Sequence, residues 1–209
     1  MLIPVIIGLL KYKELTFIYR VLVYTSCLTF LNQGLFFFLY KNNFQNLSPF
    51  WNNILNYITL LCWLPAFVFV ALSWYKVKEK ITLWLIYFLL CILLIFAEIS
   101  LTDLAQIRAS LAMSLCRLMG IIIFVFALNN VLIQKMIKKT KLVKLLIIIP
   151  FIVDNTYGIS LELFMYYLFS KETTLIFQNL YCVLIATSSL TFLCTALSMW
   201  WAPKREIFI

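Results

Sequence analysis

The sequence contains no histidine, only four glycines and few charged residues, which make up 12% of the chain. Without histidine it lacks the commonest general base and the commonest metal ligand in proteins. Soluble domains carry roughly 25% charged and about 45–50% apolar residues, whereas 65% of this chain is apolar. A water-soluble domain of 209 residues cannot bury so much apolar surface in its core. The composition therefore excludes a soluble globular domain.

Motifs for catalysis and nucleotide binding are also missing. No HExxH, G-x-S-x-G, Walker A or GxGxxG pattern occurs in the chain. The six cysteines all lie inside apolar runs and form no CxxC pair. This placement is typical of small buried side chains rather than of a zinc site or a disulfide framework. We therefore expect no cofactor and no metal, and an enzyme is the least favoured class.

Long apolar runs dominate the sequence. Several of them extend for 18 residues or more with few or no charges, which indicates transmembrane helices. They are continuously apolar, whereas the strands of a membrane barrel alternate between apolar and polar residues. We predict a single all-α domain over residues 1–209, a bundle of seven transmembrane helices at about residues 2–10, 15–40, 51–74, 81–99, 109–133, 143–169 and 174–202.

The first of these runs is short. About 20 apolar residues are needed to cross a bilayer, and only nine precede Lys11. Three interpretations stay open. The helix crosses a thinned membrane with its lysines snorkelling to the surface, or it lies partly in the interface, or the true start lies upstream.

Basic residues alternate between the two ends of the runs. One end carries three of them, Lys41, Arg108 and Lys171. The other end carries twelve: Lys11, Lys13, Lys76, Lys78, Lys80, Lys135, Lys138, Lys139, Lys141, Lys144, Lys204 and Arg205. Cytoplasmic loops are enriched in Lys and Arg, so the N-terminus is predicted outside and the C-terminus inside a bacterial inner (cytoplasmic) membrane. The net charge of +9 then indicates contact with anionic membrane lipids rather than nucleic acid.

Three ionisable residues lie deep inside the predicted helices. With a rise of about 1.5 Å per residue, Asp154 lies near the midplane of its segment and Glu162 about 7 Å further out. Arg117, on the preceding segment, lies about 6 Å outside the midplane. Because an isolated charge at this depth is costly, we predict that Arg117 pairs with Glu162 or, as an alternative, with Asp154. Asp154 would otherwise be protonated and neutral, since burial disfavours the charged form.

Further polar residues lie in the same half of the predicted bundle. The predicted ligand-binding or intramembrane polar cluster combines the three ionisable groups with four amides: Arg117, Glu162, Asp154, Asn56, Gln33, Gln178 and Asn179. The alternative is structural: the ion pair only joins two helices, and the amides cap helix ends or contact interfacial water. Intramembrane ionisable residues favour the functional interpretation.

Two features make the sixth segment a candidate moving part. Pro150 removes a backbone donor and bends a helix, and Gly158 allows close helix approach. The basic run before this segment is predicted to be an inner loop on anionic lipid. A membrane or cytoplasmic protein partner docking on that run is the alternative, at Lys135, Lys138, Lys139 and Lys141.

The chain resembles a group of small seven-helix membrane proteins from Bacteroidetes-type bacteria. The resemblance is carried by "IPVIIGLLKYKEL" at residues 3–15, "SLCRLMGIII" around Arg117, "DNTYGISLELFMYYLFS" from Asp154 and "QNLYCVLIATSSLTFL" from Gln178. In such proteins the first helix extends further towards its N-terminus than it does here. The resemblance implies a seven-helix fold and no particular activity.

Three functions are consistent with this pattern. The favoured one is a non-enzymatic sensor or receptor-like module whose outward-facing polar cavity takes a small or lipidic ligand. The second is a small ion- or proton-coupled transporter that uses Asp154 and Glu162. The third is a structural subunit of a larger membrane complex, in which the polar face contacts a partner helix.

The predicted orientation can be tested by thiol labelling of spheroplasts. A cysteine introduced by Lys139→Cys should react with a membrane-impermeant maleimide only after the membrane is opened, because that residue is predicted to be cytoplasmic. A matched Lys171→Cys substitution on the opposite face should react in intact spheroplasts. Labelling of the Lys139→Cys variant in intact spheroplasts would overturn the orientation.

Overall fold

The structure is a computed structural model, and it describes residues 2–41, 49–74, 79–102, 110–134, 136–168 and 174–202. These residues form seven α-helices and contain no strand. The helices are α1 (Leu2–Lys11), α2 (Phe17–Lys41), α3 (Pro49–Ser73), α4 (Lys80–Leu101), α5 (Leu111–Ile133), α6 (Lys138–Leu168) and α7 (Thr174–Trp201). The all-α prediction is confirmed for this part of the chain.

Five stretches are long and apolar enough to cross a membrane. They are Asn53–Ser73, Lys80–Leu101, Leu111–Ile133, Lys138–Phe164 and Cys182–Trp201. The described helix α1 has 10 residues and, at about 1.5 Å per residue, reaches about half of a hydrocarbon core. In α2, the apolar stretch Phe17–Asn32 is shorter than any of those five stretches. The crossing of the membrane by all seven helices therefore stays a prediction.

The observed helix boundaries differ from the predicted ones mainly in α6. The predicted segment began at residue 143, whereas α6 begins at Lys138. Residues of the basic run that was predicted as a loop therefore form the first turns of this helix. Lysine has a good helix propensity, and the long side chains reach solvent from a helix as easily as from a loop.

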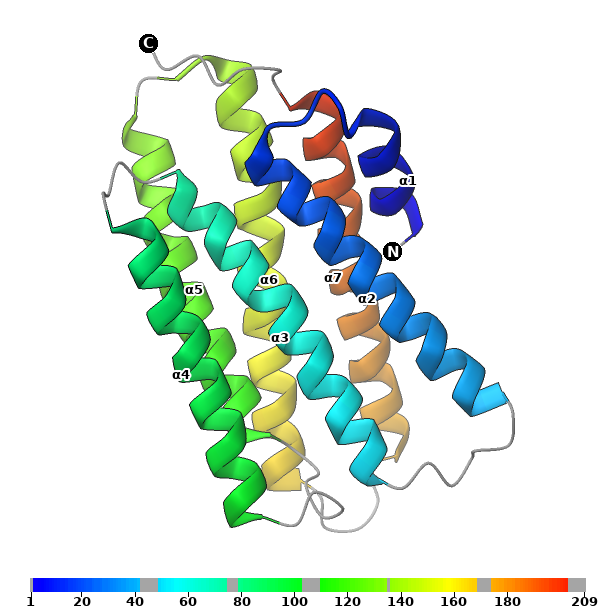
Figure 1. The fold of residues 1–209 in the computed structure, drawn as a ribbon. Helices are drawn as coiled ribbons and strands as arrows, with labels where there is room; N and C mark the ends of the chain where they lie inside the picture. Colours follow the sequence, from blue (N-terminus) through cyan, green and yellow to red (C-terminus); the bar gives the residue numbers. More distant parts are fainter. Residues whose placement is uncertain are drawn as a thin grey trace.

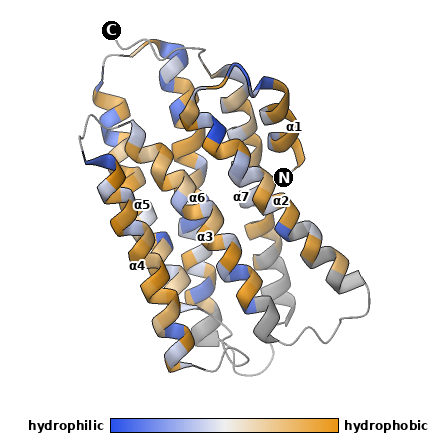
Figure 2. Cartoon of the chain, in the orientation of Figure 1, coloured by the Kyte–Doolittle hydropathy of each residue, from blue (hydrophilic) through white to orange (hydrophobic). Residues whose placement is uncertain are grey.

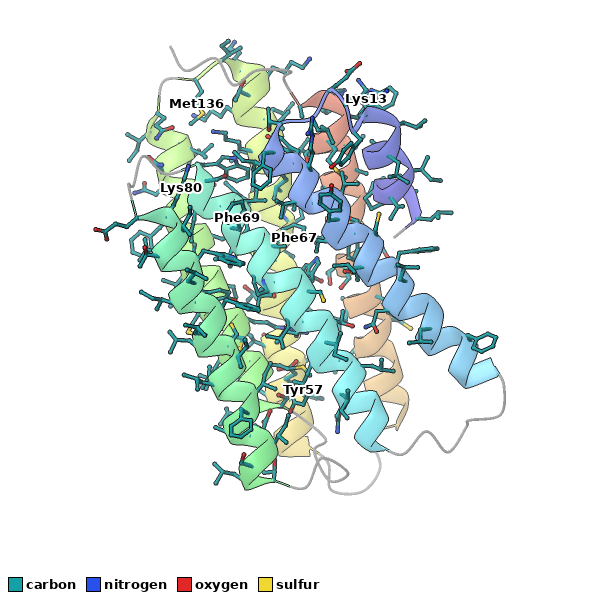
Figure 3. All side chains as sticks on the ribbon, viewed as in Figure 1. Lys13, Tyr57, Phe67, Phe69, Lys80 and Met136 are labelled. Atoms are coloured by element: carbon teal, nitrogen blue, oxygen red, sulfur yellow. The ribbon has the colours of Figure 1, made fainter. Side chains whose placement is uncertain are left out.

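The helices form one bundle in which neighbours along the chain also pack together (Figure 1). Direct contacts join α6 to both α5 and α7, α3 to α2, α4 and α5, and α1 to both α2 and α7. Figure 3 shows Lys13, Lys80 and Met136 at one end of the bundle and Tyr57 towards the other. We call these the lysine-rich end and the opposite end.

Hydrophobic residues dominate the helices (Figure 2), and many of the large ones are exposed. On α4 the large exposed residues are Ile81, Leu83, Leu85, Ile86, Leu89, Leu90, Ile92, Leu93, Phe96, Ile99 and Leu101. Soluble monomers rarely expose contiguous apolar patches larger than a few hundred Å². A surface of this kind requires lipid around it, as expected for a membrane protein.

The centre of the bundle is a stack of aromatic rings. Phe151 on α6 lies against Phe124 on α5, with ring centroids 3.8 Å apart, and against Phe67 on α3 at 5.3 Å. Trp63, one turn before Phe67, stacks on Phe151 at 5.3 Å and contacts Phe192 on α7 at 6.5 Å. The Phe151 ring thereby joins α6 to α3 and α5, and Trp63 extends the stack to α7.

Both prolines inside the long helices have carbonyl groups that accept a hydrogen bond from a neighbouring helix. Trp84 Nε1 on α4 donates to the Pro65 carbonyl oxygen of α3 at 2.8 Å. Thr191 Oγ1 on α7 donates to the Pro150 carbonyl oxygen of α6 at 3.2 Å. A proline lacks the N–H that would donate to the carbonyl four residues earlier, so these bonds do not replace the missing one but join each proline turn to the adjacent helix.

Truncation of the central ring should destabilise the whole bundle. We expect Phe151→Ala to lower the free energy of unfolding by about 3–5 kcal/mol, because the substitution leaves a cavity between α3, α5 and α6. Phe126→Ala is the matched control, since Phe126 is 62% exposed on α5 and faces lipid. Thermal unfolding in detergent measures both, and equal losses in the two variants would contradict the central role of Phe151.

Candidate functional site

An ion pair between α5 and α6 lies at the centre of the polar residues. Arg117 Nη1 lies 3.1 Å from Glu162 Oε1, and the two side chains are only 20% and 17% exposed. The structure records no such pair between Arg117 and Asp154 among the residues it describes. The pairing predicted from the depth of the two residues is therefore confirmed, and Glu162 is the partner.

Gly158 provides the space in which the Arg117 guanidinium lies. A Cβ atom added to Gly158 would meet Arg117 Nη1 in a severe clash and would lie 2.8 Å from Arg117 Cζ. All three of the nearest atoms belong to Arg117. The predicted role of this glycine was close helix approach. What approaches is the arginine side chain, which packs directly on the backbone of α6.

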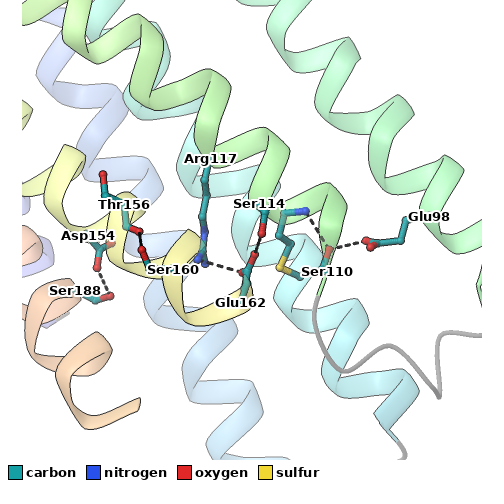
Figure 4. Close-up of polar contacts among 10 residues, drawn as sticks. Glu98, Ser110, Ser114, Arg117, Asp154, Thr156, Ser160, Glu162 and Ser188 are labelled. Carbon is teal, nitrogen blue, oxygen red and sulfur yellow. Dashed lines mark hydrogen bonds and ion pairs between the residues drawn. The ribbon is translucent and has the colours of Figure 1, made fainter. Parts of the chain in front are cut away.

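The polar contacts continue from Glu162 towards the opposite end of the bundle (Figure 4). Ser114 Oγ donates a short hydrogen bond to Glu162 Oε2. One turn earlier, Ser110 Oγ donates to Glu98 Oε2 at 2.5 Å and accepts a hydrogen bond from Met113 N at 3.0 Å. The row of side chains therefore connects α6, α5 and α4.

Glu98 caps the first turn of α5. Its Oε1 accepts hydrogen bonds from Leu111 N at 2.7 Å and Ala112 N at 3.4 Å. Its Oε2 accepts one from the Tyr57 hydroxyl of α3 at 2.6 Å. A carboxylate is favourable at a helix N-terminus because it meets free N–H groups and the positive end of the helix dipole. Glu98 therefore has a structural role: it holds the start of α5 against α3 and α4.

Asp154 lies on the other side of the ion pair and contacts α7. Ser188 Oγ donates to its Oδ1 at 2.7 Å, and Thr187 Oγ1 shares its one proton between that oxygen at 3.1 Å and the Leu184 carbonyl oxygen at 2.9 Å. The residue is 7% exposed. Among the described residues, both hydrogen bonds end on Oδ1, so Oδ2 is the oxygen left for an occupant of the adjoining cavity.

A cavity of about 710 Å³ lies beside Asp154 and Arg117, within the size range of small-molecule sites. Its polar lining comes from α2, α3, α5, α6 and α7: Thr29, Thr59, Arg117, Asp154, Ser188 and Ser189. Its apolar lining includes Leu2, Phe30, Trp63, Leu184, Ile185 and Phe192. Because Trp63 and Phe192 also belong to the aromatic stack, the cavity lies directly against the core. An occupant would meet both polar groups and rings.

Of the four amides of the predicted cluster, the one whose side chain the structure describes is not brought into this cavity. Asn56 is exposed on α3 and is not among the residues that line it. The buried neighbour Tyr57 and the cavity-lining Thr59 occupy the inward positions instead. The side chains of Gln33, Gln178 and Asn179 lie outside the described residues, so their predicted role stays a prediction.

The basic run at the lysine-rich end divides into exposed and buried lysines. Lys138 and Lys139 are exposed, whereas Lys141 Nζ donates to the Leu132 carbonyl oxygen at 3.0 Å. Lys135 lies outside the described residues. Lys144 is fully buried, with Nζ 5.5 Å from the centroid of the Trp74 ring. Sequence reasoning placed Lys144 with the lipid-facing lysines and missed this contact.

The hydroxyl partners of the carboxylates were not identified from the sequence. The partners of Asp154 lie in the run "ATSSLT" at residues 186–191, where Thr187 and Ser188 face it. A run of small hydroxyl residues facing a midplane acid on the preceding helix is the signal that would have revealed them. Within the described stretches, no three Cys, Asp or Glu side chains gather as a metal site would need.

Comparisons with protein-family models, with curated proteins and with solved structures find no match. The function must therefore be argued from the geometry of the site.

The role of Gly158 gives a direct test of the site geometry. Gly158→Ala should lower the free energy of unfolding by about 1–3 kcal/mol, because the new methyl group displaces the paired guanidinium. Gly34→Ala is the control: an added Cβ there meets nothing within 4 Å, so alanine should stabilise α2 by up to about 1 kcal/mol. Both values come from thermal unfolding in detergent.

A second background sharpens the result. In an Arg117→Met protein the clash is relieved, so Gly158→Ala should cost much less than it does in the wild type. An equal cost in both backgrounds would show that Gly158 has some other role.

Proposed function

We propose that the chain is a seven-helix protein of a bacterial inner membrane and works as a non-enzymatic sensor or receptor-like module. Its N-terminus lies outside and its C-terminus inside. A small or lipidic ligand enters the cavity beside Asp154 and Arg117. The observation that carries this proposal is the cavity of about 710 Å³ that combines an ion pair, a buried carboxylate and an apolar wall.

Helix α6 is the element through which binding would be transmitted. It carries Asp154 at the cavity, Glu162 in the ion pair and Pro150 next to the aromatic stack. Its first turn at the lysine-rich end presents the exposed Lys138 and Lys139. A proline bends a helix, so movement of α6 at Pro150 would relay a displacement at the cavity to the lysine-rich end. These lysines are the proposed contact with a partner or with anionic lipid.

A small ion- or proton-coupled transporter is the second candidate, and one observation favours it. Three carboxyl groups follow one another towards the opposite end of the bundle: Asp154 at the cavity, Glu162 in the ion pair and Glu98 beside the start of α5. Chains of acidic groups inside membranes serve as proton relays in pumps and transporters. Glu98, however, already caps α5 through two backbone N–H groups, which leaves it little freedom to move.

Filling the cavity tests the sensor proposal. Ser189→Phe should abolish the retention of any co-purified small molecule, because the ring would occupy the space that Ser189 lines. Ser160→Phe is the matched control, since Ser160 is exposed on α6 away from the cavity. Native mass spectrometry of the purified proteins gives the bound mass. Retention of the same mass by the Ser189→Phe protein would contradict a ligand in this cavity.

Transport gives a different outcome in a separate experiment. A transporter would acidify or load proteoliposomes under an ion gradient, and Asp154→Asn would abolish that flux. A receptor-like module should give no flux above that of empty liposomes in either form. Flux that depends on Asp154 would decide for the second candidate.

A further inference from the structure

The charges around the cavity are not balanced. Arg117 and Asp154 are the charged residues in its described lining, and Arg117 is already paired with Glu162 at 3.1 Å. The positive charge of the arginine is thereby matched by a carboxylate outside the lining. Asp154 receives hydrogen bonds from hydroxyl groups of α7, which are neutral. The cavity therefore carries one carboxyl group without a matching cation among the described residues, and a cation bound beside it would favour the charged form that burial alone disfavours.

Three of the four hydroxyl groups in the described lining, those of Thr29, Thr59 and Ser188, present oxygen lone pairs rather than protons. Thr59 Oγ1 already accepts one hydrogen bond from Asn32 Nδ2. Thr29 Oγ1 donates its proton to the Thr25 carbonyl oxygen at 2.8 Å, and Thr59 Oγ1 donates to the Leu55 carbonyl oxygen at 2.8 Å. Ser188 Oγ donates to Asp154. A hydroxyl has one proton and two lone pairs, so these three groups can only accept further hydrogen bonds. An occupant that donates hydrogen bonds fits this wall.

We propose that the cavity selects an amphipathic primary ammonium, whose cationic head lies at Asp154 Oδ2 and whose apolar tail lies along Phe30, Leu184 and Ile185. This inference rests on the proposed ligand-binding function and specifies the ligand class. An ammonium group offers three N–H donors and no acceptor, which matches one carboxylate oxygen and the hydroxyl oxygens around it. A charge-assisted hydrogen bond to the carboxylate is roughly twice as strong as a neutral one.

An anionic ligand is the obvious alternative, because an arginine lines the cavity. The ion pair argues against it. A carboxylate or phosphate ligand would compete with Glu162 for the same guanidinium and would approach Asp154, a like charge. Such a juxtaposition inside a protein costs several kcal/mol. Two features of the site, the pairing of Arg117 and the open oxygen of Asp154, therefore point to the same sign of charge.

Three probes with one tail and different heads separate these possibilities. The full chain in maltoside micelles is dialysed to equilibrium against radiolabelled octylammonium, octanoate or octanol at neutral pH. We expect saturable binding of octylammonium at least about tenfold tighter than that of octanoate or octanol, a difference that one charge-assisted hydrogen bond supplies. Preference for octanoate would overturn the proposal.

Two variants assign the preference to the charges named. Asp154→Asn should bring the octylammonium affinity down to that of octanol. Glu162→Gln leaves Asp154 intact but removes the negative charge that is paired with Arg117. The free positive charge of Arg117 should then weaken the binding of octylammonium and strengthen that of octanoate. The second variant keeps the test decisive if Asp154→Asn does not fold. An octylammonium affinity unchanged in Glu162→Gln would contradict the charge argument.

The outcomes also distinguish failure of this inference from failure of the proposed function. Equal binding of octanol and octylammonium would remove the selectivity and leave a ligand cavity in place. If none of the three probes bound saturably, the proposal of an ammonium ligand would be overturned. The Ser189→Phe experiment would still decide whether the cavity holds a ligand. Phosphatidylethanolamine added as competitor identifies the source: displacement of octylammonium indicates a lipid head group, and no displacement indicates a free amine.

Discussion

The pairing of Arg117 with Glu162 is the constraint on which the polar half of the bundle depends. An arginine inside an apolar bundle is costly unless its charge is matched, and the match at 3.1 Å ties α5 to α6 at one level. Gly158 makes this possible, because its missing side chain leaves room for the guanidinium against the backbone of α6. Once the two helices are fixed at this level, Asp154 lies against α7 and its hydroxyl groups. The position of the cavity follows from that register.

The aromatic stack gives the same register a second support from the other side of the cavity. Phe151 lies one turn before Asp154 on α6 and contacts rings on α3 and α5. Polar contacts and ring contacts thus hold α6 on either side of the carboxylate. A ligand that changes the position of Asp154 must change both the polar contacts and the ring contacts of α6. For this reason α6 is the element proposed to transmit binding. Packed cores switch between discrete arrangements rather than deforming continuously.

Much of this arrangement could be predicted from the sequence, and the exceptions have identifiable causes. The depths of Arg117 and Glu162 were enough to pair them, because apolar helices of known rise fix height along the bundle. Rotation about the helix axis was harder. Asn56 was expected to point inward and is exposed, whereas Thr59 lines the cavity, because weak amphipathicity in a lipid-surrounded helix leaves the inward face undefined by sequence. Lys144 was missed for a related reason: it lies over the Trp74 ring, which follows the end of α3 and is far from Lys144 in the sequence.

The pair itself can be measured by a double-mutant cycle. Arg117→Met and Glu162→Leu, each alone, should lower the free energy of unfolding in detergent by about 3–5 kcal/mol, because each leaves an unmatched buried charge. The double variant replaces both charges by apolar groups, so it should cost far less than the two losses added together. Losses that simply add would mean that the two side chains do not hold α5 and α6 together, and the account of the cavity would fail with them.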